Sequence, residues 1–442
     1  MKKTCCKLLC SAVLLSVPLP ALAAEISVDA STLFGIGQRD VSGGKKESLL
    51  PATQFLGLDV DRLADGNLSL HTYGWGRADL ADKSYNGKNE DGSLTYGYLQ
   101  YRFKQANANI RAGRTFIHEG IVNEQLDGLS VRTDLPAGFG VSAFGGAVVH
   151  GKNLSGENSD GKGASLFGGR ASYRYGSMLE LGISGLYEAK APTLNSYTHG
   201  SHRLTGIDLW LAPHKMVSLS GQSSYNPETK SVAEHSYLLT VTPLQQLIVS
   251  AEFNEYHSQN YFNSSALFTS KHMLTYNPSE RSRSIGSSVS YQLTKELELV
   301  ADYKHYSRQL GGADRYGAET RFTLTRPAYQ SDSIRYGVGY HYLHAGQEFA
   351  SAPYTTASYH ELRGYLMHDT KGYFAALDAL GFFFKGRKSA WEGTVSLGYH
   401  FTPALALSGD ISYGKNPEFS DESKGLLRLT YNTTFAQNGV KK

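Results

Sequence analysis

Charged side chains that would share one face of alternating strands fall into two groups along this chain. Basic residues come first and acidic residues follow. The basic set is Arg102, Arg111, Arg132, Arg170 and Arg174, with Arg114 close by, and the acidic set is Asp208, Glu252, Glu298, Asp302 and Glu319. If the strands enclose water, the field between a basic and an acidic arc of wall would orient charged or dipolar solutes. The same residues could instead be solvated wall charges at no particular height.

The 15 histidines give no comparable constellation. His341 and His344 are three residues apart, which on a strand places them on opposite faces and makes them poor joint metal ligands. His118 and Glu119 are adjacent but have no visible third partner, so an exposed polar pair is the favoured interpretation. The sequence therefore predicts no catalytic residues, no metal site and no cofactor.

The elements that carry these residues are strands with a two-residue period. In the closing stretch, Gly425 to Phe435, the side chains of Leu427, Leu429 and Tyr431 alternate with polar ones. Such alternation is expected where lipid lies outside a barrel and water inside. A secreted soluble all-β protein would also alternate, so the interpretation depends on how often the pattern recurs.

The pattern recurs along the whole chain, and its strands are joined alternately by long and short connections. Eleven long connections, among them 118–125 and 257–280, alternate with ten short turns such as 104–108 and 293–296. They predict an all-β, transmembrane, antiparallel up-and-down β-barrel of 22 strands, or 18–22 if weak pairs merge. An even number places both termini on the periplasmic side, and the lumen is too wide for side chains to fill.

Residues 1–23 have the basic start, apolar core and small-residue cleavage site of a secretory signal peptide. The barrel then occupies 24–442, without a preceding plug domain. All three cysteines lie in the signal, so disulfides and thiolate chemistry are excluded from the mature chain. The signal also holds three lysines, which lowers Lys+Arg from 43 to 40 against 40 Asp+Glu. This neutral balance predicts no nucleic-acid partner.

The longest connection, 257–280, is too apolar to lie freely in water. Its large apolar side chains include Phe262, Leu267, Phe268 and Met273. Exposed apolar groups of this size need cover. We expect the connection to fold into the mouth and narrow the pore, although packing over neighbouring loops or against a partner protein would also cover it.

One block of the chain resembles a segment that recurs in Gram-negative outer-membrane porin-like barrels, including alginate-export-type proteins. It comprises Ile110 to Phe116, Leu126 to Leu129, Leu135 to Gly140 and Ala143 to Gly146. The resemblance implies passive passage through a barrel, with the strand of Arg111 and Arg114 facing the lumen. The closing strand also looks like the C-terminal signal read by the barrel-assembly machinery, followed here by a seven-residue tail.

These observations favour an integral outer-membrane channel for passive diffusion of small hydrophilic or charged solutes. Its expected partners are outer-membrane lipid, the barrel-assembly machinery and the solutes themselves. In size class the barrel also resembles the porin members of electron conduits, so a sheath that holds a multihaem cytochrome is the alternative. An outer-membrane enzyme is disfavoured, because no catalytic constellation is visible.

Overall fold

The computed structural model describes residues 25–41, 45–63, 66–81, 90–149, 165–189, 201–257, 281–308, 311–325, 332–346, 357–386, 388–415 and 421–436. Within these ranges nearly all residues lie in strands. The strands of the first half are β1 (Glu25–Val41), β2 (Lys45–Leu49), β3 (Pro51–Leu63), β4 (Leu68–Asp79), β5 (Glu90–Phe103), β6 (Ala108–Glu119), β7 (Val122–Asp134), β8 (Phe139–Val148), β9 (Ser165–Tyr175), β10 (Leu179–Ala189), β11 (Ser201–His214) and β12 (Val217–Asn226). Those of the second half are β13 (Ser231–Leu244), β14 (Leu247–His257), β15 (Arg281–Gln292), β16 (Leu297–Arg308), β17 (Gly311–Thr325), β18 (Ser333–Ala345), β19 (Tyr359–Asp369), β20 (Tyr373–Phe384), β21 (Ala390–His400), β22 (Leu405–Lys415) and β23 (Glu422–Ala436).

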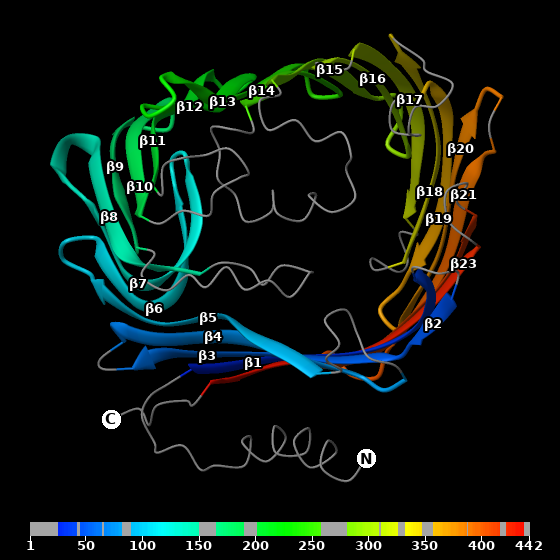
Figure 1. Ribbon diagram of the computed structural model, residues 1–442, viewed down its shortest axis with the longest axis horizontal. Helices are drawn as coiled ribbons and strands as arrows, with labels where there is room; N and C mark the ends of the chain where they lie inside the picture. The colour runs from blue at the N-terminus through cyan, green and yellow to red at the C-terminus, as the bar shows by residue number, and fades with distance from the viewer. Residues whose placement is uncertain are drawn as a thin grey trace.

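Each strand pairs with its sequence neighbour in antiparallel register, and β23 pairs with β1 to close the ring (Figure 1). The short β2 pairs with the far end of β1, while β3 pairs with its beginning, so β2 and β3 together take one place in the wall. The wall therefore has 22 strands, as the sequence predicted. Because β1 and β23 pair with each other, neither terminal strand is left as an open sheet edge.

Tight turns join the strands at one end of the barrel, as predicted for 104–108 and 293–296. The turn between β7 and β8 is a single 3-10 turn, Pro136–Gly138. Among the residues that the structure describes, no helix is long and apolar enough to cross a membrane.

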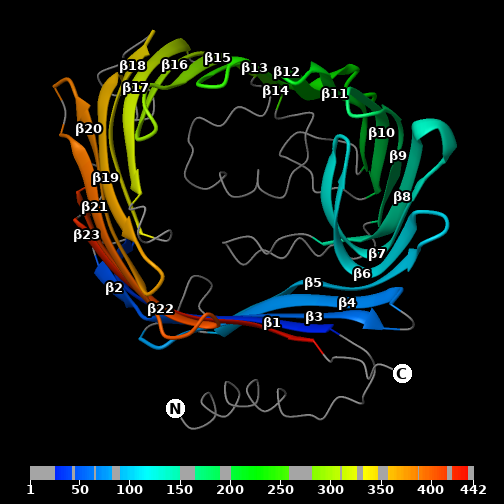
Figure 2. The same ribbon diagram turned by 180° about the vertical axis from the view of Figure 1, so that it is seen from behind.

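Cross-strand register identifies the two faces of the wall, because directly opposed residues share a face. Leu186 and Leu204 are opposed and buried against a hairpin that lies inside the ring in Figures 1 and 2. Ile183 and Ile207 are also opposed. They are an odd number of residues from Leu186 and Leu204, so they lie on the other face of the wall, and they are 68% and 55% exposed. The outer face is thus a broad apolar surface, which suits lipid rather than water.

The signal peptide predicted for residues 1–23 lies outside the described residues, as do residues 258–280 of the predicted connection 257–280, with Phe262, Leu267, Phe268 and Met273. The closing strand is confirmed: Leu427, Leu429 and Tyr431 lie on the outer face of β23. The predicted long connection at 118–125 is wrong. Only residues 120 and 121 separate β6 from β7, and the rest of that segment is paired strand.

Candidate functional site

The tip of the β6–β7 hairpin leaves the wall and enters the lumen. Pairing of β6 with β5 ends at Arg114, and pairing of β7 with β8 ends at Leu126. Pairing between β6 and β7 nevertheless continues to Glu119 and Val122. Residues 115–125, called the lumen ribbon below, are therefore held by each other and by what they pack against inside the ring (Figures 1 and 2).

Two opposed glycines stand where the ribbon departs from the wall. Gly113 pairs with Gly128, and Gly113 has φ +128°, in a region that side chains rarely occupy. A Cβ on Gly113 would lie 2.3 Å from the carbonyl oxygen of Gly97, and one on Gly128 would lie 2.2 Å from that of Gly145. The bend thus needs glycine on both strands, since any side chain there would collide with neighbouring backbone.

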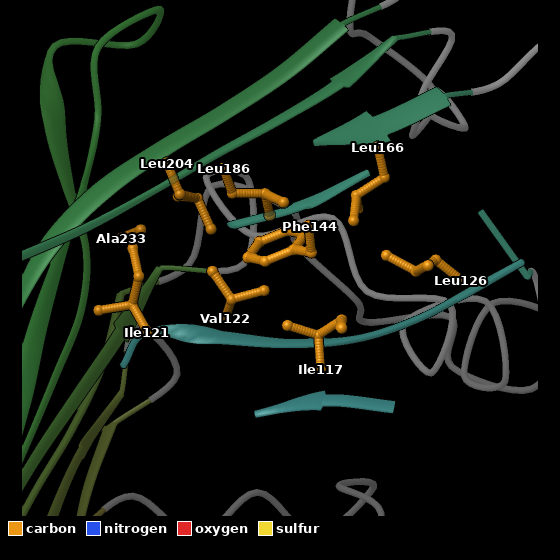
Figure 3. Close-up of a cluster of buried hydrophobic side chains, with 9 residues drawn as sticks. All are labelled: Ile117, Ile121, Val122, Leu126, Phe144, Leu166, Leu186, Leu204 and Ala233. Carbon is orange, nitrogen blue, oxygen red and sulfur yellow. The ribbon is translucent and has the colours of Figure 1, made fainter. Parts of the chain in front are cut away.

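One face of the lumen ribbon is buried in an apolar cluster against the inner wall (Figure 3). The ribbon and the strand leading from it supply Ile117, Ile121, Val122 and Leu126, each at most 3% exposed. The wall supplies one side chain from each of five strands, namely Phe144, Leu166, Leu186, Leu204 and Ala233. Burying an aliphatic side chain contributes about 1.5–3 kcal/mol, so this contact holds the ribbon firmly in the lumen.

Polar contacts secure the ribbon tip beside the apolar cluster. The backbone N–H of Ile121 donates to Ser184 Oγ at 3.2 Å, and Glu119 lies 3.6 Å from the guanidinium of Arg132. On the buried face, Glu124 lies near Glu188. Burial, together with the charge of Glu188, raises the pKa of Glu124 to about 8. Glu124 belongs to the ribbon rather than to the membrane-spanning wall, and its docked state favours the protonated carboxyl.

A polar pocket of about 460 Å³ opens between the base of the ribbon and the adjoining wall. Its lining includes Arg102, Arg111 and Arg132, with His118 and Glu119 from the ribbon. Arg102 and Arg132 lie on one row of the inner face, both opposed to Asn109.

The positive charges of these three arginines are not neutralised by a close carboxylate among the described residues. Arg111 donates to Gln100 Oε1 at 2.9 Å and lies 5.6 Å from the ring of Tyr98, both neutral partners. Arg132 is 44% exposed, and within the described part of the chain its one ion-pair contact is with Glu119, at 3.6 Å. Arg102 makes no ion pair among the described residues. The pocket can therefore attract an anionic group of a solute.

The other predicted basic residues are already neutralised. Arg170 donates through Nε to Asp208 at 3.0 Å and through a terminal nitrogen to Glu180 at 2.9 Å, and its side chain is only 8% exposed. Arg174 shares Glu180 at 2.7 Å. Arg114 forms a two-point contact with Asp127, with both distances 2.7 Å. These residues hold β9 to β11 and the hairpin in place.

The predicted acidic residues lie on the inner face too, but cations that the sequence analysis did not count lie among them. Arg315 is 2.8 Å from Asp302, and Arg321 is 2.6 Å from Glu319 and 3.7 Å from Glu298. Lys304 pairs with Glu252. Each of these four acidic residues therefore has a cation within hydrogen-bonding or ion-pair distance.

Sequence reasoning missed the lumen ribbon, which is the element that shapes the pathway. Its signal was the pair of glycines at 113 and 128 within the block that resembles porin-like barrels. The adjacent pair His118 and Glu119 was assigned to an external loop, whereas the ribbon places both at the pocket. Among the described residues, no group of His, Asp and Glu is arranged to hold a metal ion.

No family model matches the sequence, and no curated protein matches it. Solved structures with some likeness include OccAB4 of Acinetobacter baumannii, with 11% identity over 95% of this chain and 100% of that chain and a TM-score of 0.45. OccK3 (OpdO) of Pseudomonas aeruginosa has 11% identity over 93% and 96%, with a TM-score of 0.43. OccK8 (OprE) of the same organism has 10% identity over 93% and 98%, with a TM-score of 0.45. With TM-scores below 0.5, these similarities leave fold and function to be decided by the geometry of the chain itself.

Proposed function

We propose that this protein is a porin-like channel of the outer membrane through which small hydrophilic or charged solutes diffuse passively. The observation that carries the proposal is the arginine pocket beside the lumen ribbon, inside a closed 22-strand wall with an apolar outer face. A wall of this size encloses an aqueous channel unless something fills it. The ribbon narrows that channel at the level of the pocket.

Solutes that carry an anionic group fit this pathway best. Planar guanidinium groups bind carboxylates and phosphates through two parallel hydrogen bonds, and three of them line the pocket. Its volume of about 460 Å³ is that of a small-molecule site. Because the contacts are polar and open to water, a solute would be retained briefly and released, as conduction requires.

The channel would be integral to the outer membrane, with both termini and the tight turns on the periplasmic side. Bacterial barrels have short periplasmic turns and longer external connections, and the 22-strand count keeps the two termini together. We propose no enzymatic activity for it.

The alternative of a sheath around a multihaem cytochrome is not supported. The lumen ribbon occupies space inside the ring that such a partner would need (Figure 2). Among the described residues, no observation supports either a cytochrome or the barrel-assembly machinery as a partner.

Single-channel recording in a planar bilayer tests the proposal. The unmodified protein should conduct and should favour anions when a salt gradient is imposed. Arg102→Glu with Arg132→Glu should shift the reversal potential toward cations without loss of the folded barrel, because neither side chain is buried. Arg170→Gln is the matched contrast. It should lower thermal stability, since it leaves Asp208 without its buried partner. A folded protein that does not conduct would refute the channel, and an unchanged reversal potential would refute the role of the pocket.

A further inference from the structure

A charged cluster interrupts the apolar outer face where β14 ends and β15 begins. At its centre is the carboxylate of Glu255, whose side chain is only 5% exposed. Arg281 lies 2.7 Å from that carboxylate, the Nε of Arg283 lies 3.2 Å from it, and the Nε2 of His257 lies 3.3 Å from it. The two arginine side chains remain 52% and 42% exposed.

Register places this cluster on the lipid-facing side of the wall. Glu255 is opposed to Arg283, and the next opposed pair on the same face is Phe253 with Ile285. Further along that face lies Val289, and Ile285 and Val289 are 50% and 40% exposed. Side chains two residues apart on a strand share a face, so the arginines continue the apolar surface rather than the lumen.

The height of the cluster corresponds to the edge of the hydrocarbon layer. Arg281 is ten residues from Tyr291, an exposed aromatic residue at the other end of the same face. Ten residues span ~34 Å along a strand, and at the usual tilt this gives ~26 Å of height. The apolar band of outer-membrane barrels is about 25 Å tall. If Tyr291 marks one boundary, Arg281 lies at the other, on the side of the long connections.

The cluster carries more positive charge than its own contacts require. Two arginines meet one carboxylate, so the described residues at this site have a net positive charge. The buried carboxylate engages one side of each guanidinium and fixes its position. The exposed remainder of each group can still donate to an external acceptor, and guanidinium geometry suits phosphate.

We propose that Arg281 and Arg283, held by Glu255, bind the phosphate group of an anionic lipid in the membrane leaflet on the side of the long connections. The proposal relies on the membrane placement given above but makes no use of the lumen. The site would anchor the barrel to its surrounding lipid at a defined position, next to β14 and β15 (Figure 1).

Binding of diphosphorylated lipid A to the detergent-solubilised full-length protein tests this site. Thermal stability is followed as lipid is added, with dephosphorylated lipid A and inorganic phosphate as parallel probes. The phosphorylated lipid should stabilise the unmodified protein. In the triple variant Arg281→Gln/Arg283→Gln/Glu255→Gln, the lipid concentration that gives half of the maximal stabilisation should rise at least tenfold. This variant removes the buried carboxylate with its partners, which avoids an unpaired charge, and Arg281→Gln alone should give an intermediate shift.

Arg203→Gln is the matched control, because Arg203 is an outer-face arginine near a strand end, 55% exposed and paired with Glu228. It should bind as the unmodified protein does. Equal binding by the triple variant would overturn the proposal. Equal stabilisation by dephosphorylated lipid A would remove the phosphate contact, and full stabilisation by inorganic phosphate at the same concentration would make the site a free-anion site. Because the readout does not use conduction, failure of the channel proposal would be seen separately.

Discussion

Removing part of the apolar contact beneath the lumen ribbon should release the ribbon from the wall. Ile117 and Leu126 are 3% and 0% exposed, and their partners lie on separate strands of a closed ring that cannot collapse onto the space left behind. Replacing each with alanine costs about 2–5 kcal/mol. The double variant Ile117→Ala/Leu126→Ala therefore loses at least ~4 kcal/mol of docking, which shifts the ratio of docked to released ribbon by about a thousandfold.

Single-channel conductance measures this shift, because a released ribbon no longer narrows the lumen. The double variant should show larger and noisier openings than the unmodified protein. Phe116→Ala is the matched control: Phe116 lies on the opposite face of the ribbon and is 38% exposed, so its removal should leave docking intact.

A cross-link gives a second measure of docking. A Cβ on Gly120 would lie 3.1 Å from Ser184 Cβ and 2.7 Å from Asp208 Oδ2. The first separation is shorter than the ~3.5–4.5 Å of disulfides, and Gly120 has φ +61°, so the cross-link requires a small local shift of the ribbon tip. Gly120→Cys with Ser184→Cys should form a disulfide in the otherwise unmodified protein and fail to do so with the two alanines. Unchanged conductance together with an unchanged cross-link yield would refute the reasoning.

Two further predictions concern the same hairpin. The pKa of Glu124 is raised from an ordinary 4.5 to about 8, so docking of the ribbon is most stable below pH 4.5 and loses stability as pH rises to about 8. Conductance should therefore become larger and noisier across that pH window, and Glu124→Gln should abolish the pH dependence. An identical pH profile in the variant would exclude Glu124 as its cause. Gly128→Ala should impair formation of the heat-resistant folded barrel, because the new Cβ would lie 2.2 Å from a backbone oxygen. The control Gly393→Ala should fold normally, because a Cβ there would have no atom within 4 Å. Equal folding yields of the two variants would show that the bend tolerates a side chain.

The sequence by itself determined the wall. Alternation of apolar and polar residues is a local property of each strand, so it indicated the strands, their two faces and their number without knowledge of any contact. The positions of the tight turns followed for the same reason. For Arg102, Arg111 and Arg132 the alternation along the chain indicated which face of the strand each side chain shares, and the cross-strand register has Arg102 and Arg132 both opposed to Asn109.

Tertiary structure decided which of those residues remain available and where the chain leaves the wall. Arg132 and Arg170 have the same parity, yet one lines a pocket and the other is buried against Asp208, which is 38 positions away along the chain. The strand pattern also continues unbroken through the lumen ribbon, because a hairpin inside the ring alternates as one in the wall does. Parity gives the face of a strand, whereas the partner across that face depends on which strands the closed ring brings together.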